Sequence, residues 1–208
     1  MRSFIQLLVS IALFFLSANI SEGQSRFISL EGNILSKGNP VKPDGNIYKF
    51  NSPVLRLVRT QSKSSLGTIL LLPGGGYEYL RMKNEGEKVA RFLNSESFDV
   101  AILEYHISKE LKTRDMALSD ALKAFRLLNK SQKTFGLNGD RLAIMGISSG
   151  GHLAARTVQN LGKNEQPDDL ILISPTYLDE TISGTVIPKV MPPLQPSSRL
   201  FCAFSAGD

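Results

Sequence analysis

The chain has few of the side chains that build disulfides and metal centres. It contains one cysteine, Cys202, and two histidines, His106 and His152, among its 208 residues. A single cysteine excludes an internal disulfide, and so small a set excludes a zinc site of clustered cysteine and histidine. We therefore expect neither a metal nor a cofactor. Cys202 alternates with apolar neighbours, which predicts a small core residue.

The chain also lacks a large excess of charge of one sign. The chain has 24 Lys and Arg against 19 Asp and Glu, a net charge of +5. The densest basic segment, residues 123–133, has the spacing of an amphipathic helix and is interpreted as a solvated face. No basic stripe with interleaved aromatic residues occurs, so nucleic acid is not an expected partner.

The one long apolar run stands at the N-terminus. Residues 4–16 are apolar except at two positions, and they follow the basic residue Arg2. The run is shorter than the ~20 residues that span a bilayer as a helix. It has the layout of a signal peptide, with small residues at the −3 and −1 positions of a cleavage site after Gly23. We therefore predict a signal peptide over 1–23, no stable membrane anchor, and a secreted or periplasmic protein. The alternative is a retained anchor.

From residue 68 onward, apolar segments of strand length alternate with segments of helical periodicity. The expected strands are 54–58, 68–72, 99–105, 141–146, 170–174 and 200–204, and the expected helices are 85–95, 113–130 and 151–161. Segment 54–58 alternates and is expected to have one wetter face, and Thr113 is expected to be an N-cap. The helix-length crossovers predict an α/β fold, a mainly parallel sheet with helices on both faces. Ligands bind at the carboxyl ends of the strands in such sheets.

Residues 146–150 read Gly-Ile-Ser-Ser-Gly and fit the pattern G-x-S-x-G. The pattern lies directly after an expected strand and before an expected helix, which is the setting of a nucleophile elbow. There a sharp turn strains the serine backbone and lifts its hydroxyl above the sheet, while glycines permit the close backbone approach. We therefore predict that Ser148 is a nucleophile. The alternative is a glycine-rich turn with no chemistry.

Residues 73–77 read Pro-Gly-Gly-Gly-Tyr and follow an expected buried strand. Glycines there can turn backbone N–H groups inward. We predict that the amides of Gly75 and Gly76, with that of Ser149, form an oxyanion hole for a tetrahedral intermediate. The alternatives are a plain tight turn and a phosphate-binding loop. The segment lacks the Gly-Lys-Ser/Thr ending and the G-x-G-x-x-G spacing of phosphate and dinucleotide loops.

Together these segments resemble the α/β-hydrolase family, and above all its small carbohydrate-esterase-like and hormone-sensitive-lipase-like members. Those carry His-Gly-Gly-Gly followed by an aromatic residue, which residues 74–77 match after the first position, and Gly-x-Ser-x-Gly-Gly-His-Leu-Ala, which residues 146–154 match. Residues 103–105 and 138–141 also look like family segments, so the resemblance covers roughly 50–208. Pro73 stands where the family's leading histidine would be, as in variants among polysaccharide-deacetylating members. The donors are backbone amides, so this change need not disable the hole.

The resemblance implies a catalytic triad in the chain order serine, acid, histidine. Asp208, after the last expected strand, is the candidate acid, and Asp179 and Glu180 are the alternatives. His152 lies in the helix after the serine and is expected to be structural. His106 precedes the serine and stands where the family often has arginine.

The catalytic histidine is therefore expected beyond residue 208. We expect residues 24–208 to form an α/β-hydrolase domain without its C-terminal strand, histidine loop and last helix. This 208-residue form is expected to be catalytically impaired, since losing a triad member removes most of the rate enhancement.

The resemblance implies a serine-nucleophile carboxylic ester hydrolase that deacetylates or deacylates polysaccharide-derived substrates. Its expected partner is a small-molecule or carbohydrate ester, and the oligomeric state is left unknown. A serine peptidase-like hydrolase is one alternative. A catalytically inactive binding protein is the other.

Overall fold

A computed structural model describes residues 25–110, 112–176 and 199–203 of the chain. The strands are β1 (Arg26–Ser29), β2 (Ile34–Leu35), β3 (Val54–Val58), β4 (Thr68–Leu72), β5 (Asp99–Glu104), β6 (Leu142–Ile147), β7 (Asp169–Ile173) and β8 (Arg199–Ala203). The helices are a π-helical turn η2 (Met82–Glu87), α2 (Lys88–Ser95), α3 (Thr113–Ser131), α4 (Ser149–Asn160) and a 3₁₀ turn η3 (Lys163–Glu165). The predicted signal peptide lies outside the described residues.

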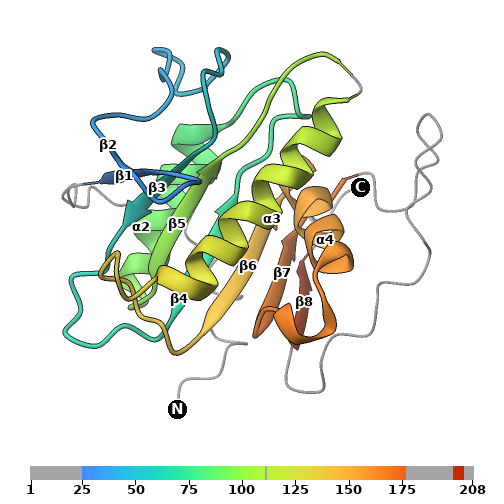
Figure 1. The fold of residues 1–208 in the computed structure, drawn as a ribbon. Coiled ribbons are helices and arrows are strands. Elements are labelled where there is room, and N and C mark those ends of the chain that lie inside the picture. The colour runs from blue at the N-terminus through green and yellow to red at the C-terminus, as the bar shows by residue number, and fades with distance from the viewer. Residues whose placement is uncertain (1–24, 111, 177–198, 204–208) are drawn as a thin grey trace.

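The strands form one sheet in the order β2-β1-β3-β5-β4-β6-β7-β8. β5, β4, β6, β7 and β8 run parallel, while β1, β2 and β3 extend the sheet with antiparallel pairs. Helices α3 and α4 cover one face and α2 covers the other (Figure 1). The predicted α/β class, a mainly parallel sheet with helices on both faces, is confirmed.

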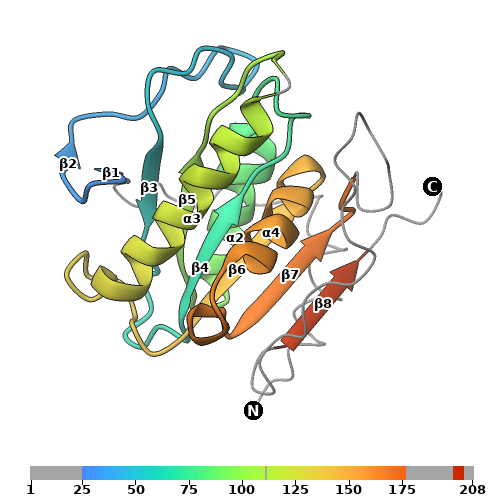
Figure 2. The same cartoon turned by 45° about the vertical axis from the view of Figure 1, so that its right-hand side comes forward.

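β4 lies inside the parallel part of the sheet, between β5 and β6 (Figure 2). All five of its residues are buried, as a continuous apolar run between two covered faces should be. Its last residue, Leu72, pairs with Gly146 near the end of β6. The glycine segment after β4 and the serine after β6 therefore leave the sheet at the same edge.

Four expectations about local detail are wrong. Segment 54–58 is buried throughout, because Arg56 is neutralised inside the protein. The helix expected at 85–95 begins earlier, as the π-helical turn η2. Thr113 is the first residue of α3 and makes no capping bond, since its hydroxyl contacts that of Ser108. Cys202 is exposed, because β8 is the edge strand of the described sheet.

A buried ion pair joins the antiparallel strands to the parallel ones. Arg56 of β3 binds the Glu104 carboxylate of β5 through Nη2, at 2.9 Å, and reaches Glu87 through Nη1. Glu104 also accepts the backbone and side-chain N–H groups of Asn39. The side chain of Glu104 is fully buried, so removing it would leave the buried Arg56 with only the partly exposed Glu87 and would take the acceptor from two N–H groups of Asn39.

Glu104→Ala should therefore lower the free energy of unfolding by about 3–5 kcal/mol, the usual effect of breaking a buried pair. Urea denaturation at neutral pH measures it. Glu110→Ala is the control, because Glu110 pairs with Lys112 at the surface and such pairs contribute about 0–1 kcal/mol. Losses of equal size in the two variants would contradict the prediction.

A membrane-spanning helix and a metal-binding cluster are both absent from the described residues. No helix among them is both long and apolar enough to cross a membrane. The same part of the chain holds no group of three or more His, Cys, Asp and Glu side chains placed to bind a metal ion.

Candidate active site

Ser148 occupies a sharp turn between β6 and α4. Its backbone angles are φ 53° and ψ −123°, a combination that costs a non-glycine residue about 1–3 kcal/mol. Its N–H donates to the carbonyl of Ile173 at 3.0 Å, and its carbonyl accepts the N–H of Gly151 at 2.9 Å. The neighbouring strand and the first turn of the helix thus hold the strained residue in place. Its side chain stands at the carboxyl edge of the parallel strands.

Glycines flank this turn for a steric reason. A Cβ at Gly146 would lie 2.1 Å from the carbonyl oxygen of Gly150, and a Cβ at Gly150 would lie 2.0 Å from that of Leu72. Such distances are far inside van der Waals contact, so the first turn of α4 approaches β4 and β6 only because both positions lack a side chain. This is the geometry that the sequence motif predicted for an elbow.

The glycine segment 73–77 passes directly beside Ser148. A Cβ at Gly74 would lie 2.9 Å from the Cβ of Ser148. Gly75 and Gly76 have φ of 136° and 66°, values that favour glycine, and a Cβ at Gly75 would overlap the carbonyl of Tyr79. The structure therefore brings the two sequence motifs together at one point.

The amides of this loop have different partners. The N–H of Gly76 donates to the hydroxyl of Ser149 at 2.9 Å, so it is engaged rather than directed at an incoming oxyanion. The N–H of Gly74 donates to the carboxylate of Glu85 at 2.8 Å. Within the described part of the chain, the backbone N–H groups of Gly75 and Ser149 have no hydrogen-bond partner. Of the predicted donors, these two are available.

A buried pair of rings connects the loop to the elbow helix. The hydroxyl of Tyr77 contacts Nδ1 of His152 at 2.7 Å, and the two rings meet edge to face. Burial, followed by the positive charges of Arg156 and Arg114, lowers the pKa of His152 to about 4. His152 is therefore neutral at physiological pH, and it joins the Pro-Gly-Gly-Gly-Tyr segment to α4.

His106 lies at the same edge of the sheet, just beyond β5. Its Nδ1 contacts Oδ2 of Asp120 on α3 at 2.5 Å, and its ring packs on Phe50. Burial raises the pKa of Asp120, although its bonds to His106 oppose the shift. The candidate acid Asp208 and the alternatives Asp179 and Glu180 lie outside the described residues.

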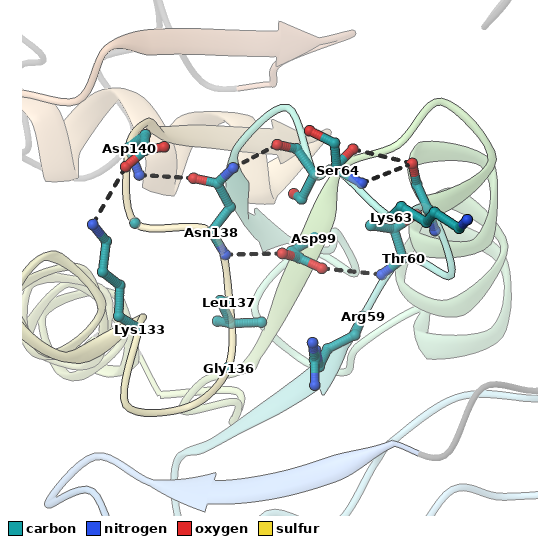
Figure 3. A pocket seen from close by; sticks show the side chains of 13 residues that line it. Arg59, Thr60, Lys63, Ser64, Asp99, Lys133, Gly136, Leu137, Asn138 and Asp140 are labelled. Atoms are coloured by element: carbon teal, nitrogen blue, oxygen red, sulfur yellow. Dashed lines mark hydrogen bonds and ion pairs between the residues drawn. The ribbon is translucent and has the colours of Figure 1, made fainter.

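A cavity of about 390 Å³ lies elsewhere on the molecule (Figure 3). It is bordered by Asp99, the first residue of β5, and by the loop 136–140 that precedes β6. It therefore opens at the amino ends of the parallel strands, opposite the edge that carries Ser148. Ser148 does not line this cavity. The buried carboxylate of Asp99 at its border already accepts the N–H groups of Thr60 and Asn138.

The backbone strain at Ser148 can be measured. Ser148→Gly should be more stable than Ser148→Ala by about 1 kcal/mol. Glycine removes the strain of the positive φ, but part of this gain is offset because glycine loses more conformational entropy than alanine on folding. Both variants lack the hydroxyl, so chemical denaturation compares the backbone alone. An alanine variant as stable as the glycine variant would contradict a strained turn.

The neutral state of His152 predicts a pH dependence. The unfolded chain binds a proton at an ordinary histidine pKa near 6.5, whereas the folded chain binds it only near 4. Stability should therefore fall as the pH decreases from about 6.5 towards 4, by on the order of 2–3 kcal/mol. His152→Gln cannot titrate and should lose less stability over this window. Parallel unfolding curves for parent and variant across it would contradict the prediction.

Known proteins share this fold and parts of this sequence. The chain is 30% identical over 117 residues to an acetylxylan esterase of Xylanibacter ruminicola, covering 55% of this chain and 24% of that protein. It is 29% identical over 118 residues to endo-1,4-β-xylanase B of Butyrivibrio fibrisolvens, covering 56% and 17%. The chain thus matches about a quarter or less of these curated relatives.

Solved structures agree on the fold. The acetyl ester-xyloside bifunctional hydrolase of Caldicellulosiruptor lactoaceticus superposes with a TM-score of 0.54 at 28% identity, over 60% of this chain and 49% of that one. MGS-M1, an α/β-hydrolase from a deep-sea metagenome library, superposes with a TM-score of 0.55 at 23% identity, over 72% and 61%. The BD-FAE family model matches residues 57–182, more than half of the sequence and both motifs of the site. The chain is an α/β-hydrolase and belongs to the BD-FAE family.

Proposed function

We propose that the protein is a serine-nucleophile carboxylic ester hydrolase that removes acetyl or related acyl groups from polysaccharide-derived substrates. The strained Ser148, between β6 and α4 and beside two backbone amides that have no partner among the described residues, is the observation that carries this proposal. The names of the matched xylan-degrading proteins support the polysaccharide ester as substrate class. The signal-peptide pattern of residues 1–23 supports secretion to the periplasm or the medium, where such polymers are met.

The reaction begins when the hydroxyl of Ser148 attacks the ester carbonyl and passes its proton to a base. The carbonyl oxygen becomes an oxyanion, which the N–H groups of Gly75 and Ser149 stabilise. The N-terminal end of α4 points at the same place and favours negative charge. The base returns this proton to the departing oxygen of the sugar, which leaves as the alcohol. Water then gives a proton to the base and attacks the acyl-serine, and the base passes that proton back to Ser148 as the carboxylic acid is released.

Gly76 has a structural role in the proposed site. Its N–H binds the hydroxyl of Ser149, so it fixes the loop against the helix instead of contacting the oxyanion. A histidine as base and Asp208 as its orienting acid complete the proposed triad, in the chain order that the fold uses.

The test uses the protein expressed from its complete gene. A fluorophosphonate probe should label Ser148, as mapped by peptide mass spectrometry, and acetylated xylo-oligosaccharides should release acetate. Ser148→Ala should abolish labelling and lower the rate by about 10³-fold or more.

Ser95→Ala is the control, because this hydroxyl lies on α2 and bonds only a helix carbonyl. A folded protein that neither labels nor releases acetate would contradict the esterase proposal. Cleavage of aminoacyl arylamides in preference to acetyl esters would replace it with a peptidase.

A further inference from the structure

The carboxylate of Glu85 is built into the loop beside Ser148. Its Oε2 accepts the N–H of Gly74, and a Cβ on Gly74 would lie 2.6 Å from that oxygen and 2.9 Å from the Cβ of Ser148. Gly74 is thus enclosed between the carboxylate and the nucleophile. The side chain of Glu85 is only 14% exposed. A carboxylate this close to the reacting serine, and this well covered, is used by no step of the proposed reaction.

The contacts of Glu85 form a closed ring. While Oε2 holds the N–H of Gly74, the backbone N–H of Arg81 donates to the carbonyl of Gly74 at 3.0 Å. The guanidinium of Arg81 in turn contacts Oε1 of Glu85 at 3.2 Å. Both polar groups of Gly74 are therefore bound to one short segment, residues 81–85. The loop cannot shift at Gly74 without breaking a charge-assisted bond.

The segment that carries Glu85 has an unusual local form. Residues 82–87 are a π-helical turn, in which the N–H of Gly86 reaches the carbonyl of Arg81 five residues back. A Cβ at Gly86 would lie 2.6 Å from Sδ of Met82, which is buried. Single π-helical turns are less stable than α-helix and occur often at functional sites. Here the turn places a carboxylate at the glycine loop.

Two side chains thus hold the two outer glycines of the loop. Glu85 binds the N–H of Gly74, and Ser149 binds the N–H of Gly76. The middle amide, that of Gly75, is left without a partner among the described residues. We propose that Glu85 is a positioning residue of the active site, whose carboxylate holds the glycine loop so that the N–H of Gly75 faces the oxyanion. This proposal rests on the proposed ester hydrolysis.

The charge of the carboxylate matters as well as its shape. Burial raises the pKa of Glu85, and the bond from Gly74 and the charge of Arg81 oppose the shift. Arg81 faces it from its own segment. Tyr105, at the end of β5, faces it from the sheet and donates its hydroxyl to the carbonyl of Pro73. Protonation of Glu85 would weaken its bond to Gly74, so the loop should loosen as the pH falls.

The experiment compares Glu85→Ala and Glu85→Gln in the protein expressed from its complete gene. With 4-nitrophenyl acetate, alanine should lower kcat by about 10- to 100-fold and change KM little, because the lost geometry acts in the transition state. Glutamine keeps an acceptor for Gly74 and should restore most of kcat at neutral pH. Glutamine does not titrate, so kcat of Glu85→Gln should fall less than kcat of the parent protein as the pH is lowered.

A second measurement does not depend on turnover. Amide hydrogen exchange, followed by NMR, should become faster at Gly74 and Gly76 in Glu85→Ala, while amides of β4 and β6 keep the parent rates. In Glu85→Gln the loop amides should remain close to the parent. Glu78→Ala is the matched control, because Glu78 lies exposed in the same loop and should leave the exchange unchanged.

Other results would overturn either the positioning role of Glu85 or the esterase proposal. Unchanged exchange and unchanged kcat in Glu85→Ala would show that Glu85 does not hold the loop. Equal loss in both variants, with faster exchange throughout the sheet, would show a general structural role and overturn the positioning proposal. A parent protein without labelling at Ser148 and without turnover would overturn the esterase proposal instead, and the exchange data would still decide whether Glu85 holds the loop.

Discussion

The close approach of α4 to the parallel strands is the constraint on which the rest of the site depends. Gly146 and Gly150 let backbone meet backbone where any Cβ would overlap a carbonyl oxygen. Because the helix starts this close to the sheet, the chain must turn sharply between β6 and α4, and Ser148 takes up the strain with a positive φ. The interior packs at near-crystal density, so neither side can yield to relieve it.

A second layer of contacts fixes the loop that faces this turn. The hydroxyl of Tyr105 binds the carbonyl of Pro73, and Tyr77 contacts His152 on α4. Glu85 and Ser149 bind the amides of two of the three loop glycines. These contacts hold the loop in one position against the elbow, and among the described residues they leave the amide of Gly75 without a partner.

The amino ends and the carboxyl ends of the parallel strands differ in how their polar groups are bonded. At the amino ends of the strands, buried carboxylates are bound by backbone amides or paired with arginines. Asp99 accepts backbone N–H groups from two loops, and Asp169 pairs with Arg141 and Arg199. At the carboxyl ends, the elbow and the glycine loop leave the amides of Gly75 and Ser149 without a partner among the described residues. The first arrangement stabilises the fold, whereas the second is the one on which the proposed ester hydrolysis depends.

Much of the fold could be predicted from local pattern alone. The bounds of β3 and β4 were predicted to the residue, and those of β6, β7 and α3 within one residue, because apolar period and glycine turns are local signals. The two motifs of the site were found the same way. Details that depend on a partner were missed. Arg56 was expected on a wetter face, but it lies buried because Glu104, on a neighbouring strand, neutralises it.

The sequence by itself determined the strands and α-helices of the parallel part, the turn that carries Ser148 and the loop that carries Gly75, since apolar period and the steric limits on backbone near glycine act over a few residues. Only the tertiary structure decided which amides remain open. The hydroxyl that engages Gly76 comes from Ser149, and the carboxylate that engages Gly74 comes from Glu85 in a π-helical turn. The bond between Gly76 and Ser149 forms only after β4 and β6 have paired, and the bond between Gly74 and Glu85 forms only when the π-helical turn packs back against the loop. The spacing of residues along the chain does not encode either bond.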